Sequence, residues 1–309
     1  MDILLSVILP VFLVLAAGYV LAWRNVISAE GIDGLMKFAQ GVAVPCLLFR
    51  NIAALDLAET FSPALIASFY AAALACFAAG IAGARWIFGR DWEDAVAIGF
   101  VALFSNSLLI GLPITERAYG PEALAPNFAI ISIHAPFCYL VGIITMEAVR
   151  ARRDGLARMP GAIGRAMAGN AIILGVGLGL ASNLTGIGLP MPLADAVDLL
   201  ARAAIPTALF GLGGVLWRYR PEGDIRQILF VTGCSLILHP ALVWVAGSVT
   251  GLSTGQFRSA VLTAAAAPGV NAYLFADMYG RARRVAASSV LVATVACAVT
   301  ATFWLSVLP

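Results

Sequence analysis

The chain has 309 residues, of which 61% are hydrophobic and only 12% are charged. Soluble domains carry about 25% charged residues, so this composition excludes a soluble globular protein and indicates one embedded in the lipid bilayer. The net charge of +2 gives no reason to expect a nucleic-acid partner. Five cysteines stand singly in apolar runs, without the spacing of a metal or redox site, so we expect no metal ion and no cofactor.

Ten segments have the roughly 20 apolar residues that a helix needs to cross a membrane. In chain order they are residues 3–23, 34–53, 63–88, 95–117, 127–149, 168–188, 193–217, 226–250, 257–280 and 285–308. The second and seventh carry charged residues, which places them in the interior of the protein. The sequence therefore predicts an all-α integral membrane protein with ten transmembrane helices.

The basic residues are distributed unevenly between the connections of these helices. Fifteen of the 19 Lys and Arg residues lie at odd-numbered connections, most densely in residues 150–167. The positive-inside rule then places the odd connections in the cytoplasm and both termini on the non-cytoplasmic side of the cell membrane, the inner membrane of a bacterium.

Two stretches of the chain resemble each other. Residues 43–49 read AVPCLLF and residues 204–210 read AIPTALF, so that Pro45 and Pro206 correspond. Proline in a helix interior removes a hydrogen bond, and we expect both residues to kink their helices near mid-membrane and to belong to the substrate site. Kinks that serve packing alone are the alternative.

The basic connection divides the predicted helices into two groups of five. With an odd number in each group, similar halves have opposite orientations in the bilayer. We therefore expect two inverted repeats, residues 1–149 and 168–309, joined by a cytoplasmic linker at 150–167.

The fourth and ninth predicted helices are each interrupted near the middle by residues that helices avoid. The fourth contains Ser105, Asn106 and Ser107, and the ninth contains Pro268, Gly269 and Asn271. Unwound backbone at membrane depth is tolerated only where protein buries it or it lines a wet cavity, so the paired interruptions predict a substrate-binding site. The half-helix after Asn106 begins with free amides and a positive dipole end, which favours an anion. Alternatively, the two asparagines only bridge helices.

Few other ionisable residues are candidates for function. His239 lies halfway along the eighth helix and could carry a coupling proton, although a buried histidine is more often a hydrogen-bond partner. Asp277 is a second candidate for proton coupling, with an ion pair to Arg281 or Arg284 as the simpler account. The sequence has no motif of catalysis, so we expect no enzyme.

Four motifs resemble the auxin efflux carrier family, which includes plant carriers and bacterial malonate or malate permeases. They are GVAVPCLLFRNIA at 41–53, SNSLLIGLPITERAYG at 105–120, IPTALFGLGG at 205–214 and APGVNAYLFADMYG at 267–280. The resemblance implies a scaffold domain, a transport domain with crossed, broken fourth and ninth helices, elevator-type movement and a homodimer. Plant members have proline in place of Ser105 and a long central loop that this chain lacks, which favours a bacterial member.

These observations predict a secondary transporter that moves a small organic anion, such as a mono- or dicarboxylate, by alternating access. The alternative is a sodium- or proton-coupled symporter or antiporter of the bile-acid-transporter type. Sodium would need a cage of carboxylate and carbonyl ligands, and no acidic residue lies near either break. The partners expected are therefore the organic anion, the lipid bilayer and a second copy of the chain.

Overall fold

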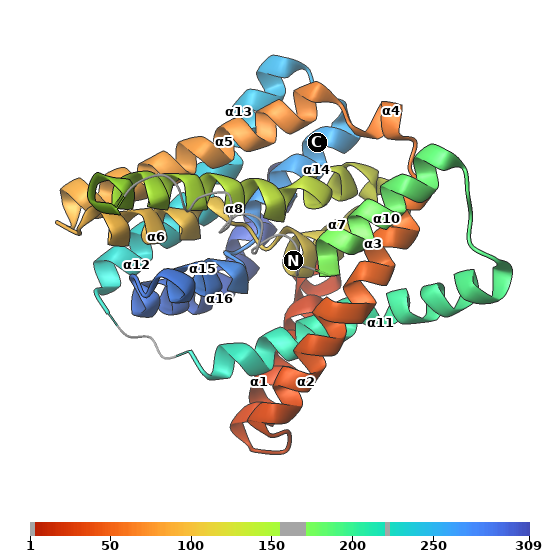
Figure 1. Cartoon of the computed structure of the whole chain (residues 1–309), viewed down its shortest axis with the longest axis horizontal. Coiled ribbons are helices and arrows are strands. Elements are labelled where there is room, and N and C mark those ends of the chain that lie inside the picture. Colours follow the sequence, from red (N-terminus) through yellow and green to blue (C-terminus); the bar gives the residue numbers. More distant parts are fainter. Residues whose placement is uncertain (1–3, 155–170, 220–222) are drawn as a thin grey trace. The chain divides into compact units, whose positions relative to one another are not determined.

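A computed structural model describes residues 4–154, 171–219 and 223–309, and every regular element among them is helical (Figure 1). Within these described ranges, seven helices are long and apolar enough to cross a membrane: Leu4–Trp23, Ala29–Ala53, Pro63–Ile87, Pro121–Arg150, Met191–Trp217, Ile225–Thr250 and Arg283–Val307. The prediction of an all-helical membrane protein is confirmed. The arrangement of ten helices in inverted repeats stays a prediction, and the linker beyond Asp154 lies outside the described residues.

The remaining predicted spans appear as shorter helices. The described part of the sixth is α10, Ala171–Thr185. The fourth consists of α6 (Trp92–Leu103), then the π-helical turn η4 (Ser107–Gly111) and α7 (Leu112–Tyr119). The ninth consists of α14 (Thr254–Ala265) and α15 (Val270–Tyr279). Both interruptions therefore lie where the polar and helix-breaking residues predict them.

The chain forms two compact units, each built from both halves of the sequence. Unit 1 contains residues 4–9, 62–154, 219 and 223–309, and unit 2 contains residues 10–61 and 171–218. The two units are defined by which residues pack together in space. The predicted domains are instead repeats defined along the sequence, and that division stays a prediction.

Unit 2 is a small helical bundle. Its elements are α1 (Leu9–Trp23), α2 (Ala29–Phe38), η2 (Ala39–Ala43), α3 (Val44–Ala53), α4 (Leu57–Thr60), α10 and α11 (Met191–Trp217). Glycines allow close packing: a Cβ on Gly213 of α11 would lie 1.9 Å from the Leu15 carbonyl oxygen of α1. A Cβ on Gly175 of α10 would lie 2.6 Å from the Pro45 carbonyl oxygen of α3, and these two helices run side by side in Figure 1.

Unit 1 holds both interrupted spans. Its other elements are η1 (Leu4–Ile8), α5 (Pro63–Ala82), η3 (Gly83–Ile87), η5 (Pro121–Leu124), α8 (Ala125–Asp154), α12 (Ile225–Gly233), η7 (Cys234–Leu238), α13 (His239–Thr250) and α16 (Arg283–Val307). The first half of each broken span packs on the second half of the other, because α6 contacts α15 while α14 contacts η4 and α7. Phe100 of α6 stacks on Phe275 of α15 with ring centroids 3.9 Å apart.

Four of the five π-helical turns in the described residues end two positions before a proline. These prolines are Pro10, Pro45, Pro113 and Pro240. Proline cannot donate to the carbonyl four residues earlier and collides with it. At Pro45 the preceding residue, Val44, donates instead to the Ala39 carbonyl five residues back, so the helix continues through a widened turn. Pro206, by contrast, lies inside α11 without such a turn.

Candidate substrate site

The two interruptions are paired through their backbones. The Asn106 N–H donates to the Ala267 carbonyl at 2.7 Å, and the Gly269 N–H donates to the Phe104 carbonyl at 3.1 Å. Together they form a short antiparallel bridge between Ser105 and Pro268. This bridge satisfies backbone groups that the broken helices leave without partners, and it places six predicted site residues, 105–107, 268, 269 and 271, in one region of unit 1.

A helix begins directly after each interruption. Asn106 caps η4, because its Oδ1 accepts a hydrogen bond from the Leu109 N–H at 3.2 Å. The Asn106 Nδ2 has no acceptor among the described residues and can donate to a ligand. The backbone amides of Ser107 and Leu108, at the start of this turn, likewise have no helical hydrogen-bond acceptor.

The second helix start, at α15, has the same character. Gly269 is its N-cap and provides no side chain, and the first bonded amide is that of Ala272, which donates to the Gly269 carbonyl at 2.9 Å. The Val270 and Asn271 amides are therefore free at the positive end of the helix dipole. Asn271 Oδ1 accepts from the Tyr139 hydroxyl at 3.4 Å, which leaves Nδ2 for a ligand. Two helix starts with amide donors suit a carboxylate.

The 30-residue helix α8 contacts both broken spans along its length. Near its start, the Asn127 Nδ2 donates to Thr263 Oγ1 of α14 at 3.0 Å and to Thr115 Oγ1 of α7 at 3.3 Å. At its middle, His134 Nε2 lies 3.1 Å from the Ser105 carbonyl oxygen. α8 therefore fixes the half-helices and the break relative to one another.

Asn127 and His134 of α8 were not among the predicted site residues. Both are almost fully buried polar residues in the apolar first half of α8. Their spacing of seven residues, which puts them on one helix face, is the signal that could have identified them. His134 lies among aromatic rings, with the Phe104 centroid at 4.9 Å and the Phe69 centroid at 5.7 Å.

The other predicted site residues are Pro45, Pro206, His239 and Asp277. Pro45 and Pro206 belong to unit 2. His239 is fully buried in unit 1, and neither of its ring nitrogens has a hydrogen-bond partner among the described residues. Its ring packs against Phe69 at 5.2 Å. Asp277 forms an ion pair at 3.0 Å with Arg283, which lies between the two arginines suggested by the sequence.

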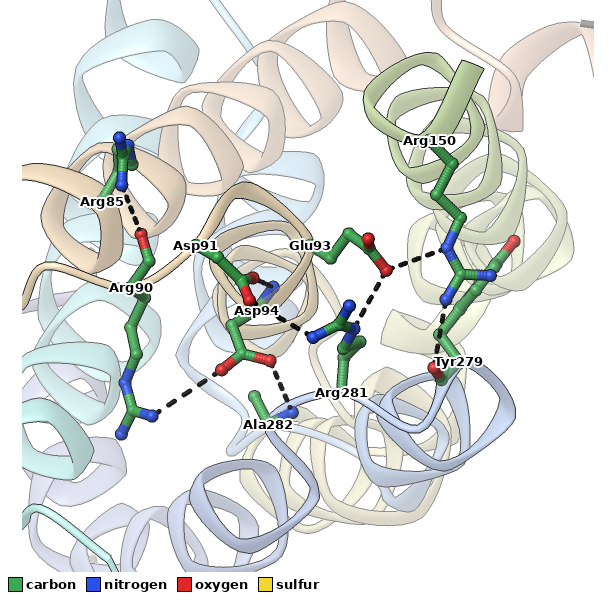
Figure 2. A network of polar contacts seen from close by, with 9 residues as sticks. All are labelled: Arg85, Arg90, Asp91, Glu93, Asp94, Arg150, Tyr279, Arg281 and Ala282. Atoms are coloured by element: carbon green, nitrogen blue, oxygen red, sulfur yellow. Dashed lines mark hydrogen bonds and ion pairs between the residues drawn. The ribbon is translucent and has the colours of Figure 1, made fainter. Parts of the chain in front are cut away.

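A network of charged residues ties α6, α8 and α15 together at the end where the basic connections meet (Figure 2). Glu93 in the first turn of α6 accepts from Arg150 of α8 at 3.0 Å and from Arg281, which follows α15, at 2.9 Å. Burial alone raises the pKa of the Glu93 carboxyl, but the two guanidinium groups outweigh it and hold the pKa below its ordinary value.

The network also contains acidic residues, which the positive-inside rule did not consider. Arg281 pairs with Asp91 at 3.2 Å, and Arg90 pairs with Asp94 at 3.7 Å. Arg90, Arg150 and Arg281 come from the third, fifth and ninth connections, so the structure brings these three to one side of unit 1 (Figure 2). Which face of the membrane that side occupies stays a prediction.

No group of three or more His, Cys, Asp or Glu residues that could hold a metal ion occurs within the described ranges. The candidate site consists of amide and hydroxyl groups on the two interrupted helices and of the His134 imidazole on α8. A family model described as "Membrane transport protein" matches residues 3–166 and 168–305. The chain belongs to this family. The match covers nearly the whole chain and confirms the resemblance to auxin efflux carriers. With its seven long apolar helices, this member is a multi-pass membrane protein.

Relatives of this family member cover most of its length. It is 26% identical over 299 residues to the "Putative malonate transporter" of Rhizobium meliloti, covering 96% of this chain and 93% of that protein. It is 22% identical over 303 residues to the "Uncharacterized transporter YfdV" of Escherichia coli, covering 97% and 96%. A mouse "Lysosomal cholesterol signaling protein" is 24% identical over 249 residues, which are 76% of this chain but 29% of that protein.

Proposed function

We propose that the protein is a secondary carrier, without enzymatic activity, that moves a small organic anion across the cytoplasmic membrane. The observation that carries this proposal is the backbone bridge between Ser105 and Pro268, which holds two helix starts together inside unit 1. A carboxylate between these starts would accept from backbone amides and from the side-chain amides of Asn106 and Asn271. The name of the Rhizobium relative favours a dicarboxylate such as malonate.

We infer that binding depends on dipoles and hydrogen bonds instead of a buried positive charge. Ser105 and Ser107 are almost fully buried, and no arginine or lysine hydrogen-bonds to the break within the described residues. Moving a charged group into the membrane is costly, whereas helix starts provide a fixed positive potential without that cost. The bound anion would itself supply the charge, and its departure would leave a neutral site.

Alternating access is proposed to follow the division into units. All six break residues belong to unit 1, so unit 1 would carry the substrate as one body while unit 2 serves as the scaffold. In this proposal the halves of the chain are inverted repeats with both termini outside the cytoplasm, and the carrier works as a homodimer. Pro45 and Pro206 would then belong to the scaffold, and we propose that they contribute to the substrate site from that unit.

Uptake into proteoliposomes tests the proposal. Purified protein is reconstituted, and uptake of radiolabelled malonate, malate, lactate and indole-3-acetate is measured with and without pH and sodium gradients. We expect saturable uptake of at least one carboxylate, and exchange with the same unlabelled anion on the opposite side. No uptake of any member of the panel by protein that elutes as a single folded species would contradict an organic-anion carrier.

Proton coupling is a second candidate, because His134 directly contacts the break. His134 Nε2 lies 3.1 Å from the Ser105 carbonyl and 3.4 Å from the Ser105 hydroxyl, whereas His239 contacts Phe69 and Asp277 pairs with Arg283. We infer that a coupling proton would bind to His134. The variant His134→Gln keeps a hydrogen-bond donor and is expected to remove the pH dependence of uptake while exchange continues. Unchanged dependence on a pH gradient in this variant would assign the proton elsewhere.

A further inference from the structure

Unit 2 contains a cavity of about 310 Å³ that is lined by residues of this unit. All eleven residues that line it are apolar, and they come from α3 with the turn before it, from α10, and from the start of α11 with the loop before it. Its volume falls at the lower end of the range for small-molecule sites, about 300–1,000 Å³. A site without polar groups cannot orient a small carboxylate, so its ligand must be a hydrocarbon.

Close packing between α3 and α10 creates the cavity. Gly175 and Gly179 bring α10 against α3, since a Cβ on Gly179 would lie 3.0 Å from the Phe49 carbonyl oxygen. Beside this contact Leu174 and Leu178 stand out from α10 and are 60% and 61% exposed. These leucines form one wall of the cavity, and in a multi-pass membrane protein an exposed apolar wall faces lipid.

A positively charged group lies next to the lining residues. Arg50, which follows the lining residue Phe49, bonds to the carboxylate of Asp198, which follows the lining residue Val197. Arg202 bonds to the same carboxylate at 2.7 Å, and 74% of its side chain is exposed. Two guanidinium groups share one carboxylate, so this group carries one net positive charge.

We propose that the cavity binds one acyl chain of an anionic phospholipid whose phosphate contacts Arg202. The acyl chain fills a space that would otherwise leave its walls without van der Waals partners. The phosphate neutralises the excess charge of the Arg50–Asp198–Arg202 group and receives charge-assisted hydrogen bonds from Arg202. This lipid is a bound partner of the scaffold unit, in contrast to the solvating lipid along exposed helices such as α16.

The experiment compares the cavity with an ordinary lipid-facing surface of the same protein. The chain is reconstituted in phosphatidylcholine liposomes that contain a trace of phosphatidylglycerol with a photoreactive diazirine in its acyl chain. Peptides labelled after irradiation are identified by mass spectrometry, with Leu174 and Leu178 reporting on the cavity. Val295 and Val299 of α16, 68% and 72% exposed, report on solvating lipid.

We expect cavity labelling to fall when unlabelled phosphatidylglycerol is added at amounts too small to change labelling of α16. The variant Leu178→Trp fills the cavity and should lower its labelling about tenfold, whereas the matched variant Val299→Trp should leave it unchanged. Arg202→Gln should raise the amount of competitor needed by about fivefold, as expected for the loss of one charge-assisted contact to the phosphate.

Two results would overturn the proposal. One is cavity labelling that follows only the bulk fraction of the probe, as on α16. The other combines two observations: the cavity is not labelled, and the Leu178→Trp variant is a monomer where the wild-type protein is a dimer in size-exclusion chromatography with light scattering. A second copy of the chain would then cover this face. An unchanged competitor requirement in Arg202→Gln would overturn the phosphate contact.

Discussion

Asn106 combines two roles that substitution can separate. Its Oδ1 caps η4 through the Leu109 N–H, and its free Nδ2 is the proposed donor to the substrate carboxylate. Asn106→Ala removes both groups. The lost cap costs about 0.5–2 kcal/mol, and Leu109, which is 7% exposed, keeps a buried amide without a partner, a penalty of about 1–3 kcal/mol.

Asn106→Asp separates the two roles, because a carboxylate caps a helix start as well as an amide does but cannot donate to an anion. We expect Asn106→Asp to keep the cap and to lose transport, while melting below wild type, because an unpaired carboxylate at this buried position is costly. A hydrogen bond to a charged group contributes about 1.5–3 kcal/mol, so its loss should lower apparent affinity about ten- to hundredfold, and repulsion between the two carboxylates should lower it further.

The assays are carboxylate uptake in proteoliposomes and thermal unfolding in detergent. Ser253→Ala is the matched control, because Ser253 caps α14 through the Gln256 N–H in the same unit without contacting the break. It should lose about 1 kcal/mol of stability and no affinity. If Asn106→Asp transported like wild type, Asn106 would be a structural cap only, and the proposed anion contact would be refuted.

Further predictions concern packing and charge. Gly213→Ala places a methyl group against the Leu15 carbonyl and should lower stability by about 1–3 kcal/mol, whereas Gly177→Ala meets no atom within 4 Å and should be neutral or stabilising by up to about 1 kcal/mol; thermal unfolding distinguishes them. Phe275→Ala removes a fully buried ring and should cost about 3–5 kcal/mol, measured in the same way; a loss below 1 kcal/mol would contradict the packing between α6 and α15. Glu93 has a lowered pKa in the folded protein, so its stabilisation is fully present above its unfolded pKa of about 4.5 and is lost as pH falls through the lower folded value. Glu93→Gln should therefore flatten the acid limb of a plot of melting temperature against pH, and an unchanged limb would assign it to other carboxylates.

The helix breaks could be predicted because their cause is local. The side chains of Ser105, Asn106 and Ser107 compete with helical hydrogen bonds, and Pro268 and Gly269 disfavour a helix. Residue type alone therefore indicated where both spans are interrupted. That the two breaks meet was expected from their matching positions in the two halves, but the hydrogen bonds between them were not predicted. Pairing of the Asn106 amide with the Ala267 carbonyl depends on the packing of distant segments.

Other features could not be predicted, because they depend on tertiary contacts. Asn127 reads as a minor interruption of an apolar helix, yet it joins α7 and α14 through two threonine hydroxyls. Proline was expected to kink helices, but the widened turn before Pro45, in which a donor shifted by one residue avoids the missing bond, was not predicted. The count of basic residues identified the arginines at one end of unit 1, while their carboxylate partners, including Glu93, appeared only in the structure.

The bridge between the two breaks has a consequence for biosynthesis. The Asn106 amide enters the membrane early, but its acceptor, the carbonyl of Ala267, is translated only about half a chain length later. At about 5–20 residues per second the ribosome needs on the order of ten to thirty seconds to supply it. During that interval the nascent first half carries an open break that water, lipid headgroups or the insertion machinery must shield. In the proposed mechanism, newly made protein would bind substrate only after residue 271 has left the ribosome.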